Sequence, residues 1–240
     1  MDPRIAIWYR QHHLHRFLPE AHLPHLRLRR YACGEALVHQ GLPVNELLFF
    51  VDGRARVVLP MANGKTLLLC FYQPLQLFGD LELFEPESVA TSRVEALSDC
   101  HCLALPMDYV RAHLAPDPAF LQSLCRSLGR KLGRVIQNSA LNMLHPLEDR
   151  LASYIQATAR LEADGMWFSG NLTQIADCLG VSFRHLHRSL QALCAEGVLE
   201  KNERRYRVLR RDELARRAGG IYVMTEDMAN AASSLYSSPK

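Results

Sequence analysis

Long apolar runs and early cysteines are two features that this sequence lacks. No apolar stretch in the 240 residues is long enough to span a membrane, and residues 1–17, MDPRIAIWYRQHHLHRF, do not resemble a signal peptide. Residues 1–32 contain no cysteine, and the chain has no nucleophile elbow, P-loop or HExxH motif. These absences predict a cytoplasmic protein with no membrane partner and no enzymatic activity, whose seven cysteines are reduced thiols.

Charge is unevenly distributed along the chain, although the net formal charge is only +3. Residues 1–125 carry 11 Lys and Arg against 13 Asp and Glu, whereas residues 126–240 carry 17 against 12. The second half is therefore net positive, which suits contact with phosphates. With 48% apolar residues, the chain has enough material for the cores of two modest domains.

The segment 171–193, NLTQIADCLGVSFRHLHRSLQAL, predicts a helix-turn-helix. Gly180 can take the positive φ that a tight turn between two helices requires. Asn171 and Ser182 can cap the two helices, and Gly197 suits a left-handed residue at the end of the second.

The second helix of this motif combines an apolar row with a polar face. Leu186, Leu190 and Leu193 recur at helical spacing and form the expected buried row. The other side presents basic and polar side chains that can reach base edges in a major groove. An ordinary helical hairpin is the alternative, but the basic residues fall on the outward face. The predicted DNA contacts of this helix are Phe183, Arg184, His185, His187, Arg188 and Gln191.

Residues 198–209, VLEKNERRYRVL, place two short apolar runs around a charged turn, which predicts a β-hairpin. A hairpin directly after a recognition helix is the wing of a winged helix. Lys201, Arg204 and Arg205 lie near its tip and are predicted to contact phosphates. A solvated charged hairpin is the alternative.

Residues 31–116 contain many short β-rich runs. Asp52-Gly53 and Asn63-Gly64 separate apolar runs, and both dipeptides are strong hairpin signals. Such a series of strands predicts a β-barrel or jelly roll. The expected strands cover residues 47–51, 54–61, 65–72, 92–97 and 100–105.

Residues 117–145 predict one long helix, with Asp117 as N-cap, Pro118 at the first position and Pro146 as its stop. Its apolar residues alternate steps of three and four, as in a coiled-coil seam, so it is expected to form a dimer interface roughly 40 Å long. The seam residues are Leu121, Leu124, Leu128, Leu132 and Val135. Gly129 and Gly133 either allow backbones to approach or are simply weak helix positions.

The fold class is therefore α+β, and a further amphipathic helix is expected over residues 147–162. The predicted order of domains is an N-terminal helical segment (1–30), a β-roll (31–116), the dimerisation helix (117–145), a winged helix-turn-helix (146–217) and a flexible tail (218–240).

This order resembles the CRP/FNR family of bacterial transcription regulators over about residues 30–210. LFFVDG at 48–53 resembles a strand and turn of that family, FGDLELF at 78–84 resembles its phosphate-binding cassette, and residues 175–182 match its helix-turn-helix. Residues 100–107 and 183–186 are most similar to the YeiL-type branch. The resemblance implies that residues 31–116 form a sensor domain similar to a cyclic-nucleotide-binding jelly roll. It also implies a homodimer that binds a two-fold operator in double-stranded DNA and contacts RNA polymerase, as activator or repressor.

The cassette departs from the members of this family that bind cyclic AMP. Those members carry Arg-Ser where Ala90-Thr91 stand here, and a Glu where Asp80 stands. Without the Arg, a cyclic phosphate loses a charge-assisted hydrogen bond worth about 1.5–3 kcal/mol. Cyclic AMP is therefore not expected as the effector, and the cassette is either a structural corner or a pocket for another effector. The candidate pocket residues are Gly79, Asp80, Leu81, Thr91 and Ser92.

Cysteines offer a second possible signal. The N-terminal cysteine cluster with which oxygen-sensing relatives bind an iron–sulfur cluster is absent here. Cys100 and Cys102 stand two apart on a predicted strand, so both thiols share one face. They can form a redox pair, ligate an iron–sulfur cluster or zinc, or serve as small buried apolar residues. The candidate redox or metal residues are Cys70, Cys100, Cys102 and Cys125.

Together these patterns predict a homodimeric, sequence-specific transcription regulator. Its β-roll senses an effector or redox signal and relays it through the dimer helix. The alternative is a ligand-binding or enzymatic protein with an incidental helical C-terminal domain. Salt-dependent DNA binding separates the two.

Overall fold

The computed structural model describes residues 2–16, 18–219 and 221–222. These residues divide into two compact units. Leaving out the residues that are not described, the first unit spans 2–57 and 72–134, and the second spans 58–71 and 135–222. The boundary falls inside the helix predicted over 117–145.

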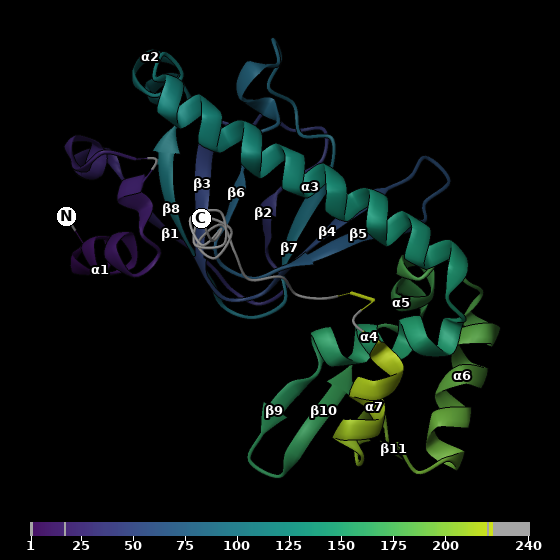
Figure 1. Ribbon diagram of the computed structural model, residues 1–240. Helices are drawn as coiled ribbons and strands as arrows, with labels where there is room; N and C mark the ends of the chain where they lie inside the picture. The colour runs from purple at the N-terminus through teal and green to yellow at the C-terminus, as the bar shows by residue number, and fades with distance from the viewer. Residues whose placement is uncertain (1, 17, 220, 223–240) are drawn as a thin grey trace, which may run out of the picture. The chain divides into compact units, whose positions relative to one another are not determined.

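Two four-stranded sheets make up the β-roll. The first has the order β1-β8-β3-β6, with every neighbouring pair antiparallel (Figure 1). The central strand β3 is buried from Leu47 to Val51, as expected for an apolar run packed on both faces. The second sheet has the order β2-β7-β4-β5. The strands are β1 (Arg27–Tyr31), β2 (Ala36–Val38), β3 (Glu46–Asp52), β4 (Ala55–Pro60), β5 (Thr66–Tyr72), β6 (Gln76–Phe78), β7 (Arg93–Ala96) and β8 (Cys100–Pro106).

The five predicted strands are confirmed as β3, β4, β5, β7 and β8. Residues 27–30, expected in the N-terminal helical segment, instead belong to β1 and pair with β8. The sequence RLRRY is charged and has no alternating apolar pattern, so it did not predict this strand. The strand is stabilised by pairing with its partner. Helical structure precedes it, as predicted, in α1 (Pro3–Gln11), η1 (Leu14–Arg16) and η2 (Glu20–His25).

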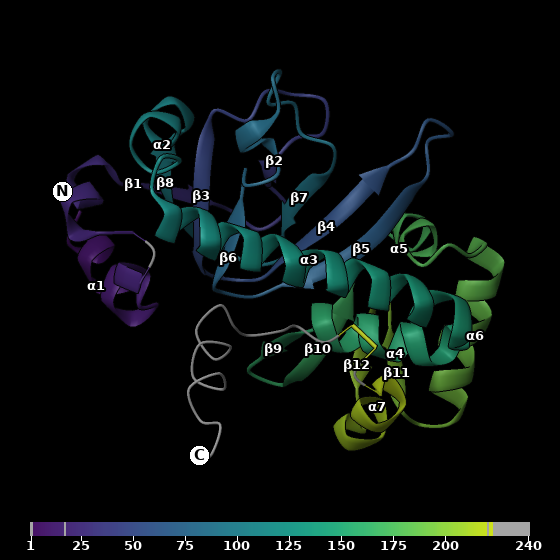
Figure 2. The same ribbon diagram turned by 45° about the horizontal axis from the view of Figure 1, so that its top comes forward.

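Two helices follow the roll strands, and the second is the predicted long helix. The short α2 (Met107–His113) was not expected, whereas α3 (Pro118–Leu144) runs unbroken for 27 residues (Figure 2). Asp117 caps α3 as predicted, because its Oδ1 accepts a hydrogen bond of 2.9 Å from the backbone N–H of Ala119. Among the described residues, no helix has both the length and the apolar composition needed to cross a bilayer.

One residue of the predicted seam on α3, Leu124, is buried, which corrects its place there, whereas Leu132 is exposed and Leu121, Leu128 and Val135 are half-buried. Leu124 is only 2% exposed and belongs to the core of the first unit. Leu132 and Ile136, by contrast, are 62% and 61% exposed, and Met143 is 86% exposed. A buried leucine cannot also face a partner, so the exposed apolar row is centred on Leu132 and Ile136.

Beside residues 58–71 and the end of α3, the second unit carries a small sheet and four further helices. Its sheet has the order β11-β12-β10-β9, and α4 packs against both α6 and α7 (Figure 1). The helix predicted over 147–162 ends earlier, at Thr158, and residues 160–162 form a strand. The elements are α4 (Leu147–Thr158), β9 (Arg160–Glu162), β10 (Gly165–Ser169), α5 (Leu172–Cys178), α6 (Phe183–Ala195), β11 (Leu199–Asn202), β12 (Arg205–Val208) and α7 (Arg211–Ala218).

The start of the predicted flexible tail is packed. Ile221 and Tyr222 are 2% and 3% exposed, and the backbone N–H of Tyr222 donates a 2.8 Å hydrogen bond to Ser153 Oγ of α4. These two residues therefore belong to the core of the second unit. The remainder of the predicted tail, at position 220 and from 223 to 240, lies outside the described residues.

Candidate nucleic-acid interface and effector site

Caps and a glycine fix the geometry of the helix-turn-helix formed by α5 and α6. Asn171 Oδ1 accepts two backbone hydrogen bonds from the first turn of α5, at 3.0 and 3.3 Å. Ser182 Oγ accepts one from the first turn of α6, at 3.2 Å. Gly180 and Gly197 have φ of +67° and +68°, as predicted for the turn and for the end of α6. The start and the end of α6 are therefore set by local sequence.

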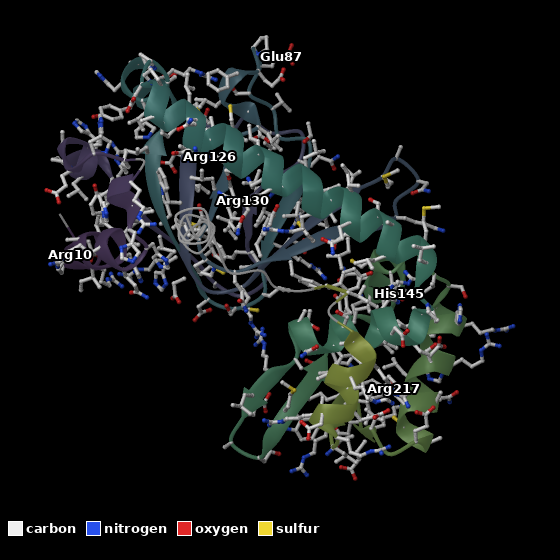
Figure 3. The ribbon with its side chains drawn as sticks, in the orientation of Figure 1. Arg10, Glu87, Arg126, Arg130, His145 and Arg217 are labelled. Atoms are coloured by element: carbon white, nitrogen blue, oxygen red, sulfur yellow. The ribbon has the colours of Figure 1, made fainter. Side chains whose placement is uncertain are left out.

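The inward side of α6 holds the helix firmly against its own unit. Leu186, Leu190 and Leu193 are fully buried, as predicted. The buried hydroxyl of Ser189 also donates a 2.9 Å hydrogen bond to Glu148 of α4. At the far end, Arg217 of α7, labelled in Figure 3, forms ion pairs that include Glu196, the C-cap residue of α6.

The outward side of α6 carries the predicted DNA-contacting residues. Phe183, Arg184, Arg188 and Gln191 are exposed, while His185 and His187 are half-buried. The ring of Phe183 stacks at 6.1 Å on that of His187 and remains 50% exposed at the start of the helix. This face presents two guanidinium groups one turn apart, an amide and an exposed aromatic ring, which are groups that read base edges and thymine methyls.

The predicted wing is the hairpin β11–β12, whose turn contains Glu203 at φ +49°. Lys201 and Arg204 are exposed, and neither forms an ion pair with the described residues. Two uncommitted cations at the tip of a hairpin suit contact with a phosphate backbone.

Arg205 differs from the other two basic residues of the wing. Its guanidinium is ion-paired with Glu162 of β9 and lies 4.4 Å from the centre of the Trp167 ring. The hydrogen bond to Glu162 raises the pKa of Arg205. Arg205 thus joins the wing to the hairpin β9–β10. To contact a phosphate, its guanidinium would have to give up its contacts with Glu162 and Trp167.

Sequence reasoning missed the hairpin β9–β10 and with it both partners of Arg205. Asp164-Gly165 between two apolar runs is the same hairpin signal that identified the strands of the roll. In the structure Gly165 lies at φ +148°, and the side chain of Asp164 accepts a 2.8 Å hydrogen bond from Trp167 Nε1.

Comparison with known proteins agrees with this geometry. Residues 28–117 match the cyclic nucleotide-binding domain family, and residues 149–217 match the Crp-like helix-turn-helix domain. The regulatory protein YeiL of Escherichia coli O157:H7 is 33% identical over 189 residues, which cover 79% of this chain and 84% of the relative. The chain belongs to the CRP/FNR family of transcriptional regulators.

More distant CRP/FNR proteins share the fold. A CRP-like cAMP-activated global transcriptional regulator of Mycobacterium tuberculosis is 24% identical over 191 residues, covering 77% of this chain and 85% of the relative. A CRP-family regulator of Thermus thermophilus superimposes with a TM-score of 0.66 at 23% identity, covering 82% of this chain and all of that one. A CRP/FNR-family regulator of Eubacterium rectale gives 0.71 at 16% identity, covering 84% and 95%.

Asp80, the carboxylate of the CRP/FNR cassette, is already paired with a side chain of this protein. Asp80 is 2% exposed, and Lys131 Nζ of α3 lies 2.7 Å from each of its two oxygens. The same ammonium group donates a 2.6 Å hydrogen bond to the carbonyl of Leu77. Gly79 lets the chain turn here, at φ +89°, where an added Cβ would lie 2.7 Å from the carbonyl oxygen of Glu46. A ligand that uses Asp80 has to displace Lys131.

A second carboxylate of the cassette, Glu82, was not among the predicted residues. It is 6% exposed, and burial raises its pKa, with repulsion from Asp80 acting in the same direction. Lys131 and the backbone N–H of Thr91 oppose this rise. Two buried carboxylates beside one ammonium group make the corner unfavourable for an anionic phosphate.

The other predicted pocket residues are less enclosed. Leu81 is 56% exposed, Thr91 is exposed and Ser92 is half-buried. The structure therefore joins Asp80, Glu82 and Lys131 into one buried cluster, whereas Leu81 and Thr91 point their side chains to the surface.

Three of the four candidate cysteines are buried. Cys70, Cys100 and Cys102 are at most 1% exposed, while Cys125 is exposed on α3. Burial raises the pKa of Cys100 and of Cys102, which disfavours their thiolates. Within the described residues, no three His, Cys, Asp or Glu side chains are placed to hold a metal ion together.

Proposed function

We propose that this protein is a homodimeric, sequence-specific DNA-binding regulator that inserts α6 into the major groove of a two-fold operator. The observation that carries the proposal is the division of α6 into a fully buried leucine row and an outward face bearing Arg184 and Arg188. The cations Lys201 and Arg204 of the wing then contact phosphates beside the base contacts. As a DNA-binding regulator, the protein would act in the cytoplasm.

Binding to operators selected from random duplexes tests this proposal. Arg184→Ala and Arg188→Ala should each cost about 1–3 kcal/mol on the selected duplex and relax preference at one base pair. Lys201→Ala should instead weaken binding to selected and scrambled duplexes alike. Arg216→Ala removes an arginine of α7 that pairs with Glu213, and it serves as the control that leaves both affinities unchanged. If Arg184→Ala and Arg188→Ala behaved like this control, the assignment of α6 would be wrong.

The exposed row of α3 supports pairing of two copies. Gly129, Leu132, Ile136 and Met143 follow Cys125 at steps of four, three, four and seven, so they share one face at coiled-coil spacing. An added Cβ at Gly129 would meet nothing within 4 Å, so this glycine serves no packing purpose in its own protomer. Two recognition helices on a dimer imply half-sites about one helical turn apart, or a multiple of it.

The signal is proposed to act through α3, because one helix carries both the exposed row and Lys131. A change at Asp80 or Glu82 alters the hold on Lys131 and can shift the helix between two packings. Resemblance to the family favours contact with RNA polymerase once DNA is bound, with activation and repression both compatible.

Thiol chemistry is an alternative signal, with Cys100 and Cys102 as the redox pair or as ligands of an iron–sulfur cluster. The test compares DNA affinity of anaerobically prepared and oxidised protein, together with an absorption spectrum and metal analysis. Replacing both cysteines with Ser should abolish any difference. The buried, protonated thiols argue for slow reaction, so a wild-type protein without bound metal and without a redox difference would end this alternative.

A further inference from the structure

A cavity of about 450 Å³ lies in the first unit, and none of its lining residues belongs to the cassette at 78–92. It opens between β1 and β2, which are the edge strands of the two roll sheets, and the loop of residues 39–46 closes one side. Its volume lies in the range of roughly 300–1,000 Å³ that is typical of small-molecule sites.

The sequence of β1 explains why this space is not filled by the core. Arg27, Arg29 and Tyr31 alternate along the strand and all three line the cavity. Side chains that face the interior of a β-roll are ordinarily apolar, but these three end in polar groups. They therefore leave a polar space at this edge of the roll, beside the buried Leu48 of β3.

The charges in the cavity leave one cation without a partner. Arg29 is satisfied by Glu46, which accepts hydrogen bonds of 2.9 and 2.6 Å from its guanidinium. Arg27 is exposed and forms no ion pair with the part of the chain that the structure describes. Arg27, Arg29 and Glu46 together therefore carry a net charge of +1.

Neutral polar groups and an apolar wall complete the lining. Burial raises the pKa of Tyr31 well above its ordinary value, so its hydroxyl stays protonated and can donate a hydrogen bond. Leu37, Val44 and Leu48 form a buried apolar wall, and Leu42, which is 54% exposed, stands at the mouth.

We propose that this cavity binds a small organic acid with one carboxylate on an apolar body. Arg27 pairs with the carboxylate through two parallel N–H bonds, Tyr31 donates to it, and the apolar body lies against Leu37, Val44 and Leu48. One uncommitted guanidinium matches a single negative charge, whereas a phosphate dianion would need further donors. No residue of the cassette lines this cavity, although the lining residues Val44 and Glu46 adjoin Gly79, so the roll has a place for an effector even with Lys131 on Asp80.

Titration calorimetry of the full chain with 2-naphthoate tests the proposal, with 2-naphthamide as the neutral analogue. Wild-type protein should bind naphthoate with a Kd below about 1 mM and the amide at least about ten-fold more weakly, since the amide lacks the charge-assisted bond. Arg27→Gln should weaken naphthoate binding by at least about ten-fold. Leu42→Asp, at an exposed position that tolerates a polar residue, should weaken it similarly by repulsion.

Arg30→Gln is the matched control, because Arg30 lies on the other face of the same strand and does not line the cavity. It should leave naphthoate affinity unchanged. Absence of saturable binding to wild-type protein, or equal affinities of Arg27→Gln and Arg30→Gln, would overturn the proposal. The measurement contains no DNA, so its failure is distinct from failure of the Arg184 and Arg188 variants on the operator.

Discussion

Lys131 of α3 is held on both carboxylate oxygens of Asp80, at 2.7 Å each, and both side chains are withdrawn from solvent. The pair connects the long helix to the cassette of the roll. Both oxygens of the buried Asp80 accept a hydrogen bond from this ammonium group.

Replacing Lys131 with Met is expected to lower the free energy of unfolding by about 3–5 kcal/mol, because it leaves a buried carboxylate without its counter-charge. Urea unfolding followed by circular dichroism measures the change. Adding Asp80→Asn to Lys131→Met should recover a large part of the loss, since the unpaired charge is then gone. Arg126→Met, at an exposed position of the same helix, is the control (Figure 3). Equal unfolding midpoints for Lys131→Met and Arg126→Met would contradict this account.

Glu82 is expected to make stability depend on pH. Its pKa is raised in the folded protein above the ordinary value of 4.5, so the folded chain keeps a proton that the unfolded chain has lost. Below that value both states are protonated and the group has no effect. As the pH rises through the interval above 4.5, the free energy of unfolding falls.

Glu82→Gln should remove this fall, so the variant gains stability relative to wild type between pH 4.5 and pH 7. Each unit by which the folded pKa exceeds the unfolded one adds about 1.4 kcal/mol to the difference. Glu85→Gln, at an exposed position nearby, should keep the wild-type pH profile. Parallel profiles for wild type and Glu82→Gln would refute the raised pKa.

Arg204 and Arg205 are neighbours with different expected roles. Arg204→Ala should leave the melting temperature unchanged and reduce the slope of log affinity against log salt concentration by about one. Arg205→Ala removes the contacts with Glu162 and Trp167, so it should lower the melting temperature by about 2–4 °C. Fluorescence anisotropy at several salt concentrations and thermal unfolding measure both. Identical behaviour of the two variants would show that the stack on Trp167 has no structural role.

Leu132→Glu or Ile136→Glu should convert the protein largely to monomer in sedimentation experiments, because a charge would enter an apolar contact between two copies. Operator affinity should fall at the same time, since the second half-site is no longer linked. Gln137→Glu adds the same charge at an exposed position outside the row and should leave the dimer intact. If Leu132→Glu sedimented like Gln137→Glu, the dimer contact would lie elsewhere.

Local signals in the sequence were sufficient for the recognition motif. The caps Asn171 and Ser182 and the glycines Gly180 and Gly197 act within one or two turns of the chain, so the sequence alone specifies where α5 and α6 begin and end. The strands flanking Asp52-Gly53 and Asn63-Gly64 were predictable for the same reason.

Features that depend on distant partners were not predictable in this way. The spacing of Leu124 suits a seam between copies and also suits burial in its own protomer, and only the tertiary structure shows that it is buried. The pairing of Lys131 with Asp80 joins residues 51 positions apart, and neither residue type predicts it. Arg205 was predicted to contact phosphate from its place near the tip of the wing, and its partner Glu162, 43 positions earlier in the chain, was expected in a helix.

The proposed pairing through the exposed row on α3 would also make the amount of protein part of its regulation. If two copies pair through Leu132 and Ile136, then below the dimer dissociation constant the dimer concentration rises with the square of the total concentration. Occupancy of the operator then responds more steeply to synthesis of the protein than it would for a monomeric binder. By the same mass action, thermal stability should increase with protein concentration.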